Sequence, residues 1–203
     1  MLTKSREKCD NKRTKYYWRK VRMRVITGTA RGRKLITLEG EDVRPTTDRV
    51  KEAMFSIIQF ELEGRRVLDM FAGSGQLGIE ALSRGAESAL FADADSRAVE
   101  IIKKNLALCG LKEKAVVVNS DSFAAITSGG FDIALLDPPY GKGILQRAVI
   151  AVADKMNPGG VIICESPYGE ELPEKAGRFS KYRTYKYGKT ELTVYRESEE
   201  EGI

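Results

Sequence analysis

Four consecutive residues at the end of an apolar run could present an amine for chemistry. The run FDIALL (131–136) is typical of a buried strand in a parallel sheet, and Asp137, Pro138, Pro139 and Tyr140 follow it directly. Because proline lacks the N–H that a ladder needs, the chain must turn away at the carboxyl end of this strand, where open α/β sheets bind ligands. A carboxylate and a backbone carbonyl there can accept both hydrogens of an exocyclic amine, while the ring stacks on the group that carries it. We therefore interpret these four as catalytic residues; the alternative is an ordinary turn.

A glycine-rich segment is the second candidate site. It runs from Asp69, at the end of an expected strand, to Gly78, and Gly73-x-Gly75-x-x-Gly78 matches the fingerprint of dinucleotide-binding turns. Asp93 follows Gly73 by 20 residues, where an acid that binds a ribose belongs. NAD sites and S-adenosylmethionine (SAM) sites share this spacing, so it does not choose between them.

Two further features favour SAM. Asp69 precedes the glycines, where a carboxylate could help to hold the cationic amino-acid part of SAM, and the turn at 137–140 has no evident task in hydride transfer. Asp121, after the third expected strand, could accept from the adenine amino group, although Asp93 and Asp121 could also be helix N-caps. The expected cofactor-binding residues are Asp69, Phe71, Ala72, Gly73, Ser74, Gly75, Gly78, Asp93, Ala94, Asp121 and Ser122.

Alternating strand and helix patterns must position these residues. Strands are expected at 66–70, 89–92, 115–118, 131–136 and 160–164, with helices at 76–84, 96–108, 121–127 and 143–155. This alternation predicts an α/β fold with a doubly wound parallel sheet. The segments Phe179–Tyr187 and Glu191–Arg196, joined by Gly188 and Lys189, predict a closing antiparallel hairpin.

The first part of the chain has a basic pattern typical of nucleic-acid binding. Two strands at 24–28 and 34–38 are expected to form a β-hairpin, followed by a helix over 50–60. Residues 1–34 carry 13 Lys or Arg against 2 acids, a balance of +11, whereas the rest carries 21 against 27, a balance of −6. A membrane-surface segment is the alternative, but the basic run lacks an apolar face. The expected nucleic-acid-binding residues are Arg24, Arg31, Arg33, Lys34, Arg44 and Arg49.

Composition excludes several kinds of chemistry. The chain has no histidine, so Ser-His and Cys-His nucleophiles and His-ligated metals are absent, and no metal site is expected. Its three cysteines are scattered, which favours free thiols in a reducing cytoplasm. No apolar run is long enough to span a membrane, and no signal peptide opens the sequence.

These motifs resemble the bacterial ribosomal RNA small subunit methyltransferase D family. The resemblance spans residues 23–196 and rests on RVITGTARGRKL, RPTTDRVKEAMF, LDMFAGSGQLGIEALSRGA, DPPY and YGKTELTVY. The first two are the most specific, because many amino-methyltransferases share the DPPY and glycine-loop motifs. The resemblance implies a Rossmann-like class I SAM-dependent methyltransferase fold, SAM as cofactor, and methylation of a guanine N2 in 16S rRNA. This family usually has Glu at the ribose position, where this chain has Asp93.

The expected organisation follows from these assignments. A basic, disordered tail (1–22) precedes an RNA-binding hairpin and helix (23–63), the methyltransferase domain (64–196) and an acidic tail (197–203). We expect a cytoplasmic monomer that acts on 16S rRNA or the small ribosomal subunit, without a metal or a membrane. The rival functions are methylation of adenine N6 or of a glutamine amide, a SAM-binding rRNA assembly factor without turnover, and a nucleotide-dependent oxidoreductase.

Overall fold

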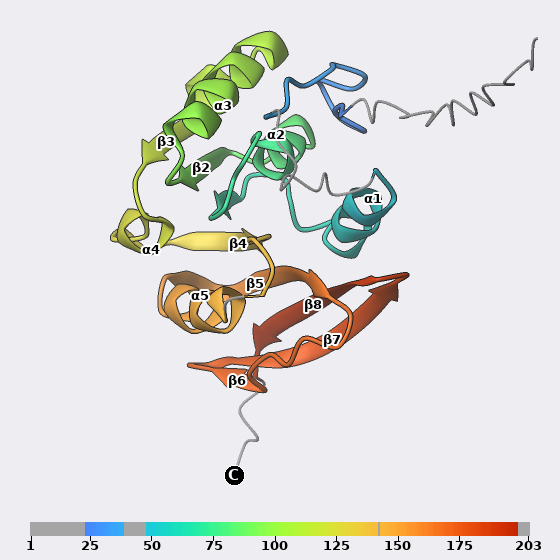
Figure 1. Cartoon of the computed structure of the whole chain (residues 1–203), viewed down its shortest axis with the longest axis vertical. Helices are drawn as coiled ribbons and strands as arrows, with labels where there is room; N and C mark the ends of the chain where they lie inside the picture. The colour runs from blue at the N-terminus through green and yellow to red at the C-terminus, as the bar shows by residue number, and fades with distance from the viewer. Residues whose placement is uncertain (1–22, 39–47, 142, 199–203) are drawn as a thin grey trace, which may run out of the picture.

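One eight-stranded sheet organises the chain (Figure 1). The computed structural model describes residues 23–38, 48–141 and 143–198. The strands are β1 (Arg66–Asp69), β2 (Ser88–Asp93), β3 (Ala115–Asn119), β4 (Phe131–Leu136), β5 (Met156–Pro167), β6 (Lys175–Ala176), β7 (Phe179–Tyr187) and β8 (Thr190–Glu197). The helices are α1 (Asp48–Ile57), α2 (Gln76–Ser83), α3 (Ser96–Cys109), α4 (Ser122–Ala125) and α5 (Ile144–Ala153), with a 3-10 turn η1 (Lys112–Lys114).

The strand order is β3-β2-β1-β4-β5-β8-β7-β6. Strands β1 to β5 pair in parallel, and β8 enters antiparallel between β5 and β7, which confirms the doubly wound sheet with antiparallel closing strands. The chain builds outward from β1 to β3 on one side and then returns to place β4 on the other side of β1. This reversal between β1 and β4 is a topological switch point, where α/β sheets bind ligands.

Both faces of the sheet are covered by helices, as the continuous apolar strands require. Helices α1, α2 and α3 pack on one face, with Met54, Phe55, Ile79 and Ile102 among their buried side chains. Helix α5 packs on the other face through residues such as Val149. Alternate residues of each strand face these two cores.

Most element boundaries agree with the sequence within a few residues, but β5 and β6 differ. Strand β5 extends over Met156–Pro167, beyond the expected 160–164, because β4 and then β8 pair with it along its length. Strand β6 is only Lys175–Ala176, too short to produce a hydrophobic period.

The expected N-terminal β-hairpin is replaced by a loop with a single antiparallel bridge, between Arg24 and Lys34. Backbone hydrogen bonds join the Val25 N–H to the Arg33 carbonyl and the Leu35 N–H to the Met23 carbonyl, both at 2.9 Å, but the next N–H groups along the chain bind side chains of the domain. The N–H groups of residues 26 and 27 donate to the Glu80 carboxylate of α2, at 2.7 and 3.0 Å, and the N–H of residue 36 donates to Asn105 of α3 at 2.8 Å. The segment therefore lies against the domain rather than projecting from it.

Two predictions of the sequence fall outside the described residues. These are the tail at 1–22 and, within 39–47, Arg44. The acidic tail is described only through residue 198. The proposed division into an appendage and a methyltransferase domain stays a prediction.

Candidate functional site

The turn that follows β4 presents an acid, a carbonyl and an aromatic ring at the carboxyl edge of the sheet. Asp137 and Tyr140 are half-buried, Pro138 is buried, and Pro139 is exposed. Strand β4 lies between β1 and β5, so this turn emerges next to the ends of both neighbours. The four residues of the predicted catalytic set are thus held at the switch point.

A second carboxylate, which sequence reasoning missed, lies beside this turn. Leu136 pairs in parallel register with Cys164, so Asp137 and Glu165 follow neighbouring strand positions at the same level. Glu165 is 4% exposed, and its Oε1 accepts a hydrogen bond from the Tyr140 hydroxyl across 3.3 Å. An acid directly after the apolar run VIIC was the available signal, but nothing in the sequence pairs it with the turn.

The glycine turn joins β1 to α2 and depends on a close approach between helix and sheet. A Cβ on Gly78 would lie 2.3 Å from the Phe91 ring of β2, so only glycine fits there. At Gly73, with φ 53°, no atom lies within 4 Å of the position a Cβ would take, which leaves open space beside the backbone. Such an open backbone turn can receive a ligand.

Asp69 supports this turn from within the protein. It is 2% exposed, and its Oδ2 accepts the Gly78 N–H at 2.8 Å, which ties the end of β1 to the first turn of α2. Burial raises the pKa of the Asp69 carboxyl to about 7; the Gly78 N–H opposes this rise, while the charges of Asp137 and Asp93 add to it. The three acids therefore act on one another across the carboxyl edge of the sheet.

Asp93 ends β2 and braces the same turn. One carboxylate oxygen accepts the Gly73 N–H and the other accepts the Asp95 N–H, both at 2.8 Å. The N-cap of α3 is Asp95, which accepts the Arg97 N–H. Asp93 is therefore not the cap of that helix, and its half-buried carboxylate lies at the turn, next to exposed Ala94.

Aromatic side chains gather at the other end of the candidate cofactor site. Asp121 caps α4 by accepting the Phe123 and Ala124 N–H groups, and Ser122 is 6% exposed. Phe123, which sequence reasoning did not single out, meets Phe71 edge to face, with ring centroids 6.3 Å apart. Capping uses only one oxygen of Asp121 in these contacts, so a ligand role and a cap role are compatible.

The remaining predicted cofactor residues lie in the same turn. The Ala72 N–H donates to the carbonyl of residue 92 in β2, at 3.1 Å. Ser74 is 9% exposed; its hydroxyl contacts the Met23 sulfur at 3.0 Å, and its carbonyl accepts from Asn105 at 2.9 Å. Ser74 and Gly75 thus tie the glycine turn to the N-terminal loop and α3, facing inward rather than toward an open surface.

The predicted RNA-binding cations that the structure describes are on the surface. Arg31, Arg33 and Lys34 are exposed around the bridged N-terminal loop. Arg24 is exposed and lies 3.4 Å from Asp48 at the start of α1, where Arg49 is also exposed. Beneath them Lys51 is fully buried, donates to the Arg24 carbonyl at 2.7 Å, and has its pKa lowered by burial.

The residues present are suited to SAM. The backbone beside Gly73 has open space, Asp93 presents a carboxylate at the turn, and Phe71 and Phe123 form an apolar pair of rings, which are the kinds of group that a nucleoside with ribose hydroxyls and a flat ring needs. Among the described residues no group of acids or cysteines could hold a metal ion, and no described helix is long and apolar enough to cross a membrane.

Fold and site together define a class of enzyme: the sheet, its closing antiparallel strands and the glycine turn are those of a Rossmann-like SAM-dependent methyltransferase. Residues 23–196 match the family described as "Conserved hypothetical protein 95". The chain belongs to this family, whose named members include ribosomal RNA small subunit methyltransferase D.

Known proteins similar to this chain cover most of its length. It is 40% identical to YlbH of Bacillus subtilis over 182 residues, which cover 86% of this chain and 98% of that protein. It is 35% identical to ribosomal RNA small subunit methyltransferase D of Escherichia coli over 178 residues, covering 85% of this chain and 89% of the other. Its fold matches that of a 16S rRNA N2 methyltransferase of Thermus thermophilus, solved with AdoMet and guanosine, with a TM-score of 0.66 and 27% identity over 79% of this chain and 45% of that one. The chain is therefore a SAM-dependent rRNA methyltransferase.

Proposed function

We propose that this chain transfers a methyl group from SAM to the exocyclic N2 of a guanine in 16S rRNA. The relatives named for the small ribosomal subunit support the substrate, and the guanosine-bound structure supports the base. The observation that carries the proposal is the turn after β4 at the switch point, where Asp137 follows the strand position that pairs with the residue before Glu165, and the Tyr140 hydroxyl donates to Glu165.

The acceptor amine needs help because its lone pair is delocalised into the guanine ring. In this proposal Asp137 and the Pro138 carbonyl accept the two N–H hydrogens and localise the lone pair on nitrogen, while Tyr140 stacks on the flipped base. Positive charge grows on this nitrogen as the new bond forms, so fixed acceptors stabilise the transition state more than the ground state. Asp137 would also accept the proton that the methylated amine loses.

On the cofactor side, bound SAM would supply an electrophilic methyl group. Asp93 is assigned to the ribose hydroxyls, and Asp121, Ser122, Phe71 and Ala94 to the adenine end. Asp69 is assigned a supporting role: its carboxylate accepts the Gly78 N–H and so orders the glycine turn that would hold the amino-acid end of SAM.

The exposed cations Arg24, Arg31, Arg33, Lys34 and Arg49, together with Arg44, are assigned to the RNA backbone. The reaction is assigned to the cytoplasm, where ribosomes are assembled, and the enzyme is expected to act as a monomer. Light scattering of the purified chain, alone and with RNA, tests the oligomeric state.

Transfer of radioactive methyl from SAM tests the function. Purified protein is incubated with 16S rRNA transcripts and with small ribosomal subunits, and the modified nucleoside is identified after digestion. Labelled N2-methylguanosine is expected. Label found in N6-methyladenosine or in protein would show that the acceptor is adenine or a protein rather than guanine. Absence of label from both substrates would reject the proposal.

A further inference from the structure

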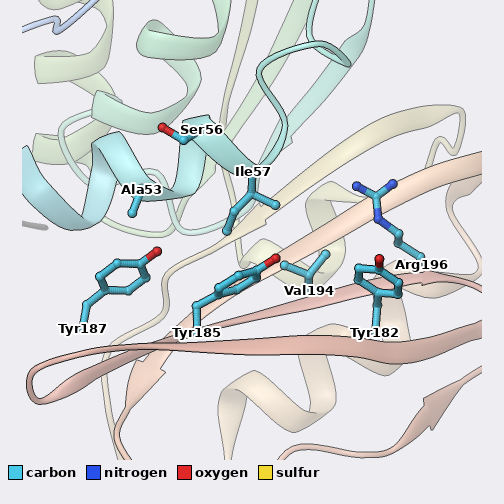
Figure 2. A pocket seen from close by; sticks show the side chains of 8 residues that line it. All are labelled: Ala53, Ser56, Ile57, Tyr182, Tyr185, Tyr187, Val194 and Arg196. Atoms are coloured by element: carbon cyan, nitrogen blue, oxygen red, sulfur yellow. The ribbon is translucent and has the colours of Figure 1, made fainter.

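A groove lined by tyrosines lies between α1 and the closing strands (Figure 2). Its volume is about 630 Å³, and it is open to solvent. Tyr182, Tyr185 and Tyr187 of β7 form its floor beside Arg196 of β8, and the side chains of Ala53 and Ile57 of α1 point toward them. We call this surface the tyrosine groove.

A β-bulge places the three rings together. Residues 182 and 185 are separated by an odd number of positions and would point to opposite faces of a regular strand. Lys181 pairs with Tyr195 and Arg183 pairs with Val194, so Tyr182 is an extra residue in β7. The bulge therefore turns Tyr182 to the face that carries Tyr185 and Tyr187.

The tyrosine groove lies on the same face of the sheet as the acceptor turn. Glu165 of β5 pairs with Leu192 of β8, and Leu192 pairs with Tyr185 of β7. Paired residues share a face, and two strand spacings separate the backbones of Glu165 and Tyr185 by about 10 Å. Tyr187 is nearer still to the edge from which the acceptor turn emerges, because β7 runs parallel to β5.

Charge favours a polyanion as the occupant. Residues 178–189 (RFSKYRTYKYGK) contain five Lys or Arg and no acid, although residues 35–203 as a whole carry six more acids than bases. Two of the five, Arg178 and Lys181, pair with Glu197 and Glu174. Arg196 of the groove pairs with Glu61, so Arg183 is the cation beside the rings that is left for a polyanion. The Arg183 guanidinium lies 5.8 Å from the ring centroids of both Tyr182 and Tyr185, and that of Arg196 lies 5.6 Å from Tyr182. Aromatic rings interleaved with arginines are typical of surfaces that stack nucleic-acid bases and hold the backbone.

We propose that the tyrosine groove binds unpaired bases of the substrate RNA that flank the target nucleotide. The inference rests on the proposed function for the identity of that RNA. Stacking on Tyr182 and Tyr185 would hold the strand on one side of the acceptor turn, while the exposed cations of the N-terminal loop contact phosphates elsewhere. Flipping the target base requires that its neighbours be held, which this groove would do.

The test compares two double variants that differ in their ability to stack. Tyr182→Leu/Tyr185→Leu keeps apolar bulk and removes the rings, whereas Tyr182→Phe/Tyr185→Phe keeps the rings and removes the hydroxyls. Affinity for a 16S rRNA transcript is measured over a salt titration, with SAM affinity and thermal unfolding measured in parallel. The Leu pair should bind RNA about tenfold more weakly or worse, and the Phe pair within about twofold of the original protein. The salt slope should not change, because stacking releases no counterions.

Two controls separate the groove from folding and from surface aromaticity in general. Tyr182→Leu alone alters a side chain that is 60% exposed, so it should fold normally and still weaken RNA binding by several-fold. Phe60→Leu alters a ring that is 93% exposed outside the groove and should leave RNA affinity unchanged.

Several outcomes would overturn the inference. Unchanged RNA affinity in folded Leu variants would do so, as would an equal loss of affinity in the Phe pair. If the Leu variants bound the transcript normally but lost affinity for small ribosomal subunits, the occupant of the groove would be a protein. RNA binding is measured without turnover, so failure of methyl transfer in the original protein would reject the proposed function separately.

Discussion

The Tyr140 hydroxyl donates to Glu165 Oε1 across 3.3 Å, and this contact joins the acceptor turn after β4 to the end of β5. Tyr140 thus has a ring that can stack and a hydroxyl already used within the protein. Substitutions at Tyr140 can therefore test the ring and the hydroxyl separately.

Tyr140→Phe should lower kcat only about three- to tenfold, because it removes one hydrogen bond that orients the ring. Tyr140→Ala should lower it much further, since stacking on the base is lost as well. Steady-state kinetics on rRNA gives both values, and Glu165→Met, which removes the acceptor of this bond, should resemble Tyr140→Phe. Equal damage from Phe and Ala would assign the hydroxyl itself to the chemistry.

Asp137→Ala should lower the methyl-transfer rate by about 10²–10³ and leave SAM affinity within a few-fold. The carboxylate stabilises charge that develops on the acceptor nitrogen, and it lies in the β4 turn rather than in the glycine turn. Single-turnover kinetics and calorimetry measure the two quantities. Near-normal turnover in this variant would remove Asp137 from the mechanism.

Asp93→Ala should weaken SAM binding without changing which base is methylated. The substitution removes the expected ribose acceptor and also the acceptor of the Gly73 N–H. Asp93→Glu keeps the charge and should retain most of the affinity. The matched control is Asp95→Ala, which removes the α3 N-cap and should lower the thermal stability modestly with SAM affinity kept. Unchanged calorimetric affinity in Asp93→Ala would restrict Asp93 to bracing the turn.

Asp69 should make the ligand-free protein less stable as pH rises from about 4 to about 7. Burial raises the pKa of this carboxyl to about 7, so over that range the folded state holds a proton that the unfolded state has lost. Stability therefore falls with increasing pH, by a few kcal/mol in order of magnitude. In the Asp69→Asn variant, this fall in the free energy of unfolding between about pH 4 and about pH 7 should disappear. Denaturant unfolding at several pH values compares the two proteins, and parallel pH dependences would contradict the expectation.

Replacing Arg31, Arg33 and Lys34 together by Ala should weaken RNA binding and flatten the salt slope of log affinity by roughly 2. The three side chains are exposed, so folding and SAM binding should change little. A variant with Lys104, Lys112 and Lys114 replaced by Ala loses the same charge at exposed positions around α3 and η1 and serves as the control. If the first variant keeps the original slope, the N-terminal loop does not hold the RNA. Deleting residues 1–22 should flatten the slope further only if that tail touches the RNA.

The sequence by itself determined the sheet and the two turns that carry the expected chemistry. Apolar runs of strand length alternate with amphipathic helices, and glycine or proline directly after a strand dictates how the chain leaves the sheet. These are local properties, so the strand at Phe131–Leu136, the turn at Asp137 and the glycine turn could be predicted from neighbouring residues alone.

Only the tertiary structure decided which distant residues share a site. Glu165 meets Tyr140 because β4 and β5 pair in a particular register, and Tyr182 joins the tyrosine groove because β7 gains a bulge against β8. In the N-terminal segment the expected ladder ends after the Arg24–Lys34 bridge, because Glu80 and Asn105, on helices far along the chain, accept the N–H groups that would continue it. Register and side-chain capture of backbone groups depend on contacts between residues far apart in sequence, which no local pattern encodes.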